Sequence, residues 1–96
     1  MTHYNHALFA RYTVQKLNKF DRWISKNPLI YRLFVRFAEQ YRSTGSDRCS
    51  AALIGNRIRW EVAVKTSGED GFKISNDYFP LLARKLAVDD PSFINF

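Results

Sequence analysis

Apolar residues recur at intervals of three and four along most of the chain, which is the spacing of one face of an α-helix. The clearest example follows Asn27-Pro28, a capping residue before a proline suited to the first helical turn. The apolar members of this stripe are Ile30, Leu33, Phe34, Phe37, Ala38 and Tyr41. The stripe stops at the breaker Ser43-Thr44-Gly45, so the pattern predicts a helix between these two boundaries.

A second helical stripe precedes Asn27. Its apolar members are Ala10, Val14, Leu17 and Ile24. The neighbouring face carries Tyr12, Lys16, Lys19, Trp23 and Lys26. A basic face interleaved with aromatic residues is unusual for a merely solvated surface. The alternative is that Tyr12 and Trp23 pack at the edge of the core while the lysines lay their stems along it and keep their charges in water.

The segment RIRWEVAVKT, residues 57–66, fits two periods. With period two, Trp60 lies on a buried face while Arg59 and Lys65 point the other way, as in a strand. SGEDG then forms a turn and FKIS a returning strand, and the resulting β-hairpin resembles the wing of a winged helix. Gly55-Asn56 favours this interpretation, because both residues are poor in a helix interior and common at a helix end.

With a period of 3.6, the same residues continue a helix that Ser50 caps. Its inward stripe consists of Ala51, Ile54, Ile58 and Val62. Arg57 then pairs with Glu61, which is one turn away. In either geometry Trp60 is the residue expected to anchor the segment to the core. Taken alone, the alternation favours the strand.

The last predicted element is a helix that begins near Asn76 or Asp77, either of which is a good cap. Pro80 then lies in the first turn, where proline is tolerated, and Asp89-Asp90-Pro91 ends the helix. The inward residues are Phe79, Leu82, Ala83 and Leu86. Arg84-Lys85 point outward, so this helix could serve as a recognition helix. The tail SFINF is apolar enough to dock on the body of the protein.

The chain has 96 residues, which indicates a single domain, 1–96, whose first few residues we expect to be frayed. Hydrophobic residues make up 46% of it and aromatic residues 16%, enough for a dense core at this small size. Cys49 is the only cysteine, so no internal disulfide can form. No signal peptide and no membrane-spanning run is visible. We therefore expect a protein of the bacterial cytoplasm without membrane association.

Several short motifs occur in an order that resembles a family of small, uncharacterised phage and prophage proteins. They are FDRW leading into NP, a helix ending in RFA, SAALI, RIRWE, GFKI, a proline-opened helix with AR, and DPSF. The likeness covers roughly residues 20–96 and implies a phage or prophage origin and a helix-turn-helix-like arrangement, without implying any catalytic residue. This chain departs from the family pattern at Gly55 and Asn56, where helix-compatible residues are expected, and at Phe79, where a small capping residue is usual. The resemblance is compatible with a helix that continues through RIRWE, which brings the strand and helix interpretations of residues 57–66 to about equal support.

Fifteen Lys and Arg residues against nine Asp and Glu residues give a formal net charge of +6. Such an excess suits a partner rich in phosphate or carboxylate. The binding surface that we expect comprises Arg57, Arg59, Lys65, Lys73, Arg84 and Lys85, and the second candidate set is Lys16, Lys19 and Lys26. The alternative is a solvated or salt-bridged surface that only keeps the protein soluble.

Other chemistry has little support in the sequence. His3 and His6 have a spacing that could bind metal, but no cysteine or carboxylate is near them in the sequence. Cys49 has no obvious partner for nucleophilic catalysis and is better interpreted as a structural thiol. There is no glycine-rich phosphate loop, zinc spacing or nuclease-like acid cluster. We therefore expect no enzymatic activity, no cofactor and no metal.

The sequence as a whole predicts a mainly α-helical, helix-turn-helix or winged-helix-like domain, with or without a short β-hairpin. The function expected first is that of a phage accessory protein that binds nucleic acid or a nucleoprotein complex through a basic surface. The second is that of a phage inhibitor that binds a host defence protein, such as a CRISPR effector. The second expectation is an analogy with other small phage proteins rather than an inference from chemistry.

Overall fold

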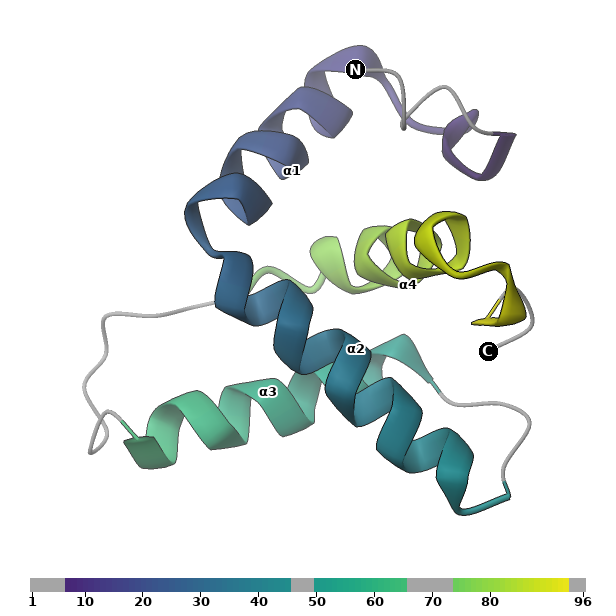
Figure 1. Cartoon of the computed structure of the whole chain (residues 1–96). Helices are drawn as coiled ribbons and strands as arrows, with labels where there is room; N and C mark the ends of the chain where they lie inside the picture. Colours follow the sequence, from purple (N-terminus) through teal and green to yellow (C-terminus); the bar gives the residue numbers. More distant parts are fainter. Residues whose placement is uncertain (1–6, 46–49, 66–73, 94–96) are drawn as a thin grey trace.

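The protein is mainly helical, as the sequence predicts. The computed structural model describes residues 7–45, 50–65 and 74–93, and for residues 63–65 it describes the backbone only. Within these ranges the elements are η2 (Ala7–Phe9), α1 (Val14–Lys26), α2 (Pro28–Ser43), α3 (Ala51–Lys65), α4 (Tyr78–Asp89) and η3 (Pro91–Phe93) (Figure 1). No β-strand occurs in them.

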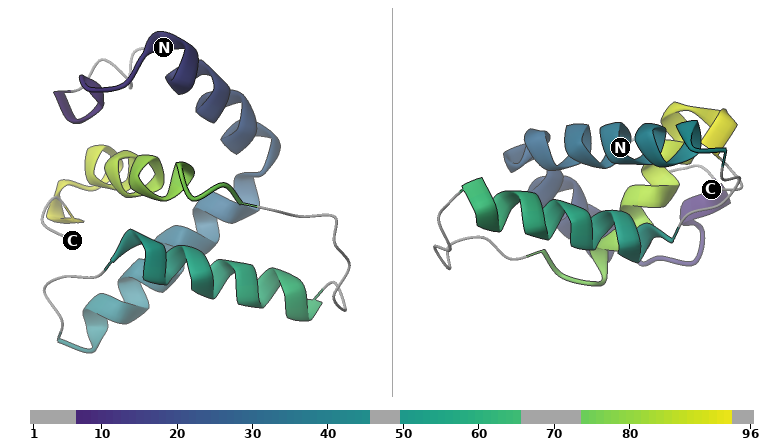
Figure 2. Two further views of the ribbon diagram at one scale, coloured as in Figure 1. Left: turned by 180° about the vertical axis from the view of Figure 1, so that it is seen from behind. Right: turned by 90° about the horizontal axis from the view of Figure 1, so that it is seen from below.

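Helix α4 is the central element of the fold. It contacts α2, α3 and both short 3-10 helices, and in Figure 1 it lies between α1 and α3. Helix α2 crosses α3, and the view from below in Figure 2 shows these two helices lying one above the other. Pro80 and Asp89 are the only exposed residues of α4, while Arg84 and Lys85 are half-buried. The expectation that α4 acts as a recognition helix stays a prediction.

The core is built from the apolar stripes that the spacing predicts, with differences at their edges. Every predicted inward residue of α2 is buried except Tyr41, which lies at the rim. In α1, Leu17 and Ile24 are buried as expected, but Val14 is 71% exposed. The largest fully buried side chains are Phe9, Phe20, Phe34, Ile58, Leu81 and Leu82. Ala10, which precedes α1, is also exposed. The predicted stripe therefore begins about two turns too early, and Phe20, which the stripe did not include, is buried in the core.

The junction between α1 and α2 is a single residue, Asn27. Its side chain makes no capping bond to α2; instead its Nδ2 donates to the carbonyl of Trp23, 2.9 Å away, at the end of α1. The predicted cap therefore serves the preceding helix, while Pro28 opens α2 at a position that needs no N–H donor. Helix α1 is capped by Thr13, whose hydroxyl accepts from the backbone N–H of Lys16 at 3.1 Å.

The strand interpretation of residues 57–66 is wrong for residues 57–65, which belong to α3. Tertiary packing decides between the two periods, because Ile54 and Ile58 are buried in the core and Val62 packs against it, as a helical stripe requires. Trp60 does not anchor the segment, since it lies on the other side of the helix and is 66% exposed. The remainder of the predicted hairpin, including Lys73, lies outside the described residues.

Gly55 lies inside α3 and does not end it. A Cβ atom at this position would come within 2.2 Å of Cε1 of Phe79, whose ring is buried against the helix backbone. Glycine therefore allows α4 to approach α3 closely at its first turn. Gly55 and Phe79 therefore complement one another in the structure.

Hydrogen bonds among Asp90, Ser92 and Arg42 stabilise the end of α4. The Asp90 carboxylate accepts from the backbone N–H and hydroxyl of Ser92, at 3.1 and 2.7 Å. These bonds, the hydroxyl first, lower the pKa of Asp90, and the charge of Arg42 acts in the same direction. Arg42 also donates to the Ser92 hydroxyl at 2.7 Å and covers the Phe93 ring. Phe93 is buried, so the described part of the SFINF tail docks as predicted.

Candidate nucleic-acid interface

The structure separates the basic residues that the sequence groups into one surface. Arg57 faces α2, Arg59 and Arg84 line a groove between α3 and α4, and Lys85 lies against Tyr31 of α2. The side chain of Lys65 and the whole of Lys73 lie outside the described residues. The single basic surface expected from the sequence is therefore not formed as such.

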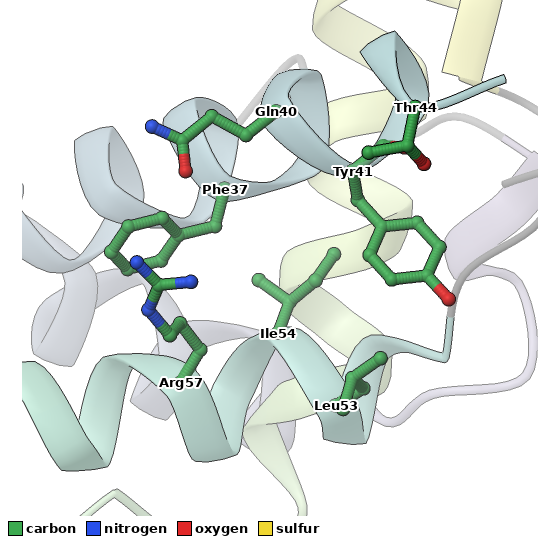
Figure 3. A pocket seen from close by; sticks show the side chains of 7 residues that line it. All are labelled: Phe37, Gln40, Tyr41, Thr44, Leu53, Ile54 and Arg57. Atoms are coloured by element: carbon green, nitrogen blue, oxygen red, sulfur yellow. The ribbon is translucent and has the colours of Figure 1, made fainter. Parts of the chain in front are cut away.

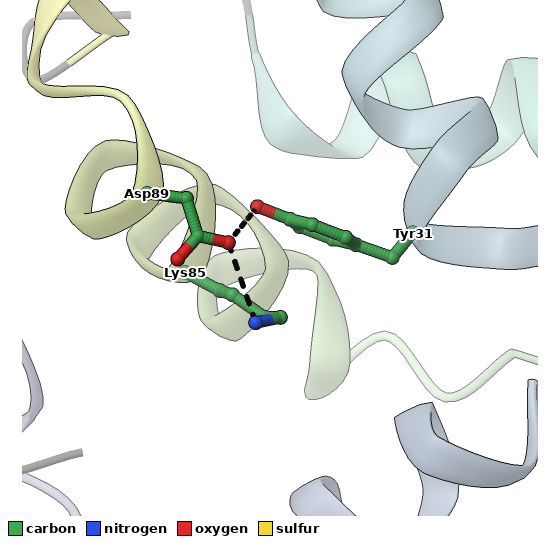
Figure 4. Close-up of polar contacts among 3 residues, drawn as sticks. All are labelled: Tyr31, Lys85 and Asp89. Atoms are coloured by element: carbon green, nitrogen blue, oxygen red, sulfur yellow. Dashed lines mark hydrogen bonds and ion pairs between the residues drawn. The ribbon is translucent and has the colours of Figure 1, made fainter. Parts of the chain in front are cut away.

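Lys85 is neutralised within the fold. Its Nζ lies 3.3 Å from Oδ2 of Asp89, and the same oxygen accepts from the Tyr31 hydroxyl at 2.5 Å (Figure 4). The ammonium group also lies 4.7 Å from the centroid of the Tyr31 ring, and the side chain is only 19% exposed. A charge that is paired and mostly covered adds little to a phosphate-binding surface, so Lys85 is an inter-helix contact.

Arg57 belongs to a different face of the protein. It lines a groove of about 370 Å³ in which Phe37 and Tyr41 of α2 face Leu53 and Ile54 of α3 (Figure 3). Its guanidinium lies 4.6 Å from the centroid of the Phe37 ring, and its Nε is 3.6 Å from a carboxylate oxygen of Glu61. The pairing with Glu61 is the one that the helical interpretation predicts. The described lining of this α2–α3 groove is mostly apolar and includes one cation.

Arg59 holds the chain together at the start of α4. Its Nη1 donates to Oδ1 of Asn56 at 3.1 Å, and its Nη2 donates to Oδ1 of Asn76 at 2.8 Å and to the carbonyl of Ile74. The guanidinium also lies 4.7 Å from the centroid of the Phe79 ring. Arg59 thus joins α3 to the segment that leads into α4, a structural task that the sequence pattern did not reveal.

Three cations gather around the ring of Tyr12. The guanidinium carbons of Arg84 and Arg11 lie 5.3 and 5.8 Å from its centroid, and Nζ of Lys16 lies 5.8 Å from it. These distances are within the range of cation–π attraction. No carboxylate forms an ion pair with these three cations in the described part of the chain. We call Arg11, Tyr12, Lys16 and Arg84 the Tyr12 cluster.

The charge of the Tyr12 cluster continues along α1. Lys16, Lys19 and Lys26 follow one another at steps of three and seven residues, which places them on one side of the helix. Lys19 and Lys26 are exposed, and the only acid of α1, Asp21, is two residues from Lys19 and so about 160° around the helix from it. Together with the Tyr12 cluster this stripe forms the basic face, which consists of Arg11, Lys16, Lys19, Lys26 and Arg84.

Tyr12 and Trp23 pack at the edge of the core, which is the alternative that the sequence left open for them. Trp23 stacks on Tyr78 of α4 with ring centroids 4.5 Å apart, and Phe20 lies 5.5 Å from the same ring. Tyr12 is half-buried and packs against the core. Trp23 therefore attaches α1 to α4, and the lysines beside it remain directed toward solvent.

The basic face joins residues from the first and second candidate sets, Arg84 from one and the lysines of α1 from the other. No sequence pattern selects Arg11, although it stands directly beside Tyr12. Arg32 and Arg36, on the outer side of α2, are exposed and make no charge pair with a described residue. Neither of them is among the cations that contact the Tyr12 ring.

The described residues contain no group of three or more potential metal ligands, and His3, His6 and Cys49 lie outside them. None of the described helices is both long and apolar enough to cross a membrane. Comparison with protein-family models, with curated proteins and with solved structures gives no match for the chain. The assignment of a function therefore rests on the geometry of the surface.

Proposed function

We propose that the protein binds nucleic acid through the basic face. The observation that carries this proposal is the meeting of Arg11, Lys16 and Arg84 around Tyr12, without a carboxylate paired to them in the described part of the chain. Holding like charges together raises the local positive potential, and a polyanion that releases its counterions on binding benefits most from such a surface.

The dimensions of the face suit a nucleic-acid backbone. Lys16 and Lys26 are ten residues apart in one helix, which corresponds to about 15 Å along its axis. That length matches the rise of about four nucleotides in one strand of a duplex. Long, flexible lysines at the exposed edge of a helix can follow the phosphates without reading the bases, so we expect binding with little sequence preference.

The test is a pair of charge reversals with equal change in net charge. Lys19→Glu combined with Lys26→Glu places two carboxylates on the basic face, whereas Arg32→Glu combined with Arg36→Glu places them on the outer side of α2. Binding of a labelled duplex, a single strand and an RNA is measured at low salt by fluorescence anisotropy. We expect the α1 pair to weaken binding by more than about tenfold and the α2 pair to have a much smaller effect.

Two results would count against the proposal. If the two pairs weaken binding equally, the affinity follows the net charge and the basic face has no special role. If the wild-type protein binds none of the three probes at low salt, nucleic-acid binding is wrong. Since Lys19 and Lys26 are exposed and form no charge pair with a described residue, the variants should fold normally.

The phage accessory role and the helix-turn-helix arrangement are part of the same proposal. The support for a phage origin is the motif order in the sequence. A helix-turn-helix use of this fold would place α1 rather than α4 against the nucleic acid, because α1 presents exposed cations while α4 is enclosed. Helices α1 and α2 are consecutive and are separated by Asn27 alone.

Binding to a host defence protein is the second candidate function, and a separate surface favours it. Trp60 is 66% and Leu53 50% exposed, and the two are seven residues apart, so they share one side of α3. Leu53 also lines the α2–α3 groove (Figure 3). Exposed aromatic and aliphatic side chains at a groove are typical of protein interfaces. Binding lost in Trp60→Lys and insensitive to salt would favour this candidate; binding that Trp60→Lys leaves unchanged would exclude this surface.

A further inference from the structure

The groove between α3 and α4 lies beside the Tyr12 cluster and has a volume of about 720 Å³. Its lining residues are Ser50, Ala51, Ala52, Asn56, Arg59, Asn76, Phe79, Pro80, Ala83 and Arg84. Three of the lining residues are alanines, whose side chains are short. Arg84 belongs both to the groove and to the Tyr12 cluster. Among the described residues, the lining includes two guanidinium groups and no carboxylate.

Arg59 fixes the orientation of two amide side chains in this groove. Guanidinium groups only donate hydrogen bonds, so each amide must present its oxygen to Arg59. The bonds are those to Oδ1 of Asn56 and to Oδ1 of Asn76, at 3.1 and 2.8 Å. The oxygens of both amides are therefore engaged, and the Nδ2 groups remain as donors. Neither Nδ2 group donates a hydrogen bond to a described residue.

The polar side chains that remain available to a ligand are consequently donors. They are the amide nitrogens of Asn56 and Asn76 and the guanidinium of Arg84, which uses its Nη1 in one bond to the carbonyl of Pro80 at 3.2 Å. The hydroxyl of Ser50, which also lines the groove, is engaged as the acceptor of the backbone N–H of Ala52 at 3.1 Å. A groove that offers donors and positive charge but no carboxylate suits a ligand made of acceptors and negative charge. A phosphate group, with oxygens that accept from several directions, meets this description.

We propose that the α3–α4 groove is a phosphate-binding site that takes a backbone phosphate of the bound nucleic acid. The inference rests on the proposed function, because a strand lying on the basic face reaches the groove at Arg84. Arg59 is a positioning residue, which sets the amides, while Arg84, Asn56 and Asn76 contact the phosphate. The groove then fixes where along the protein the strand enters.

Asn76→Asp distinguishes the two roles of this side chain, which accepts from Arg59 through Oδ1 and is proposed to donate to phosphate through Nδ2. A carboxylate can still accept from Arg59, so the link between α3 and α4 is preserved, but it has no N–H₂ to donate and it repels phosphate. Gln40→Glu is the matched control, since it makes the same change in charge on α2, at an exposed residue that does not line the groove. Arg84→Gln removes the cation without adding an acid.

The readout is the side-chain amide region of nitrogen–proton NMR spectra of the full chain, with inorganic phosphate and with a short single-stranded oligonucleotide as probes. We expect both probes to shift the Nδ2 resonances of Asn56 and Asn76 in the wild-type protein. Apparent phosphate affinity should fall by more than about tenfold in Asn76→Asp and in Arg84→Gln, as expected when a hydrogen bond to a charged group is lost. Gln40→Glu should behave as the wild type does.

The outcomes distinguish this site from the proposed function. If the oligonucleotide shifts backbone resonances of α1 but neither probe moves the Asn56 and Asn76 amides, the groove is not a phosphate site, although nucleic-acid binding stands. If inorganic phosphate moves these amides and the oligonucleotide does not, the nucleic-acid source of the phosphate is wrong. Equal losses in Asn76→Asp and Gln40→Glu would show general repulsion and would also overturn the inference.

Discussion

At the scale of single residues, Gly55 and Phe79 show how one close contact determines the relation of two helices. Alanine is favoured over glycine in a helix interior by about 1 kcal/mol. At this position the added Cβ would lie 2.2 Å from a ring atom of Phe79, and the ring is buried, so it cannot move aside. We therefore expect the packing cost to exceed the gain in helix propensity.

Gly55→Ala should lower the free energy of unfolding by about 1–3 kcal/mol, the usual cost of overpacking a core. In a Phe79→Leu background, where the outer ring atoms are absent, the same substitution should cost much less or become stabilising. Urea unfolding of the four proteins measures this coupling. An equal cost of Gly55→Ala in both backgrounds would mean that the ring and the helix backbone are not in contact.

Arg59 and Arg84 look equivalent in the sequence, but the structure predicts different effects on stability. Arg59→Ala removes the bonds to Ile74, Asn56 and Asn76 that join α3 to the start of α4, and should cost about 1–3 kcal/mol. Arg84→Gln, which interrupts one bond to a carbonyl of its own helix, should change stability by less than about 0.5 kcal/mol. Thermal melts of the two variants check this, and equal melting temperatures would contradict the role given to Arg59.

At the scale of elements, the sequence predicts α2 well and α3 poorly for one physical reason. The buried apolar residues of α2 lie on one side of the helix and recur at helical spacing, so the helical period fits them. In α3 the buried Ile54 and Ile58 and the exposed Leu53 and Trp60 lie on different sides, so period two fits as well. Which of these residues are buried depends on α2 and α4, and that information is not local to the segment.

The helical assignment of α3 makes opposite predictions for two neighbouring apolar residues. Ile58→Ala should cost about 2–5 kcal/mol, because its side chain is fully buried in the core. Trp60→Gln should change stability by no more than about 0.5 kcal/mol, because the indole is mostly exposed. Chemical denaturation of both variants tests the assignment. A large loss for Trp60→Gln, with extended backbone chemical shifts over residues 58–62, would restore the strand.

At the scale of the whole molecule, the candidate site could be predicted only in part. The composition and the spacing in α1 indicate a basic protein with one lysine stripe, and Lys16, Lys19 and Lys26 can be identified from the sequence. The meeting of Lys16 with Arg84 around Tyr12 joins α1 to α4 through the fold, and no local pattern reveals it. The pairs of Arg57 with Glu61 and of Lys85 with Asp89 are each one helical turn apart, and the first is the pair that the helical interpretation predicts. The contact of Asp89 with Tyr31 of α2, in contrast, depends on the fold.

The molecule has two candidate binding surfaces, one basic and one apolar. The basic face runs along α1, and the exposed apolar residues lie on α3, with α4 between the two helices (Figure 1). The two surfaces differ in their response to salt, because phosphate contacts release counterions whereas apolar contacts do not. Salt dependence is therefore the property that identifies which surface carries the function.

The most direct test is the slope of the logarithm of duplex affinity against the logarithm of salt concentration. It is measured for the wild-type protein, for the triple variant Lys16→Gln, Lys19→Gln, Lys26→Gln, and for the control Arg32→Gln, Arg36→Gln. We predict a steep wild-type slope that becomes shallower by about 0.9 for each phosphate contact removed in the triple variant, and an almost unchanged slope in the control. A wild-type slope near zero, or one that the triple variant leaves unchanged, would contradict nucleic-acid binding by the basic face.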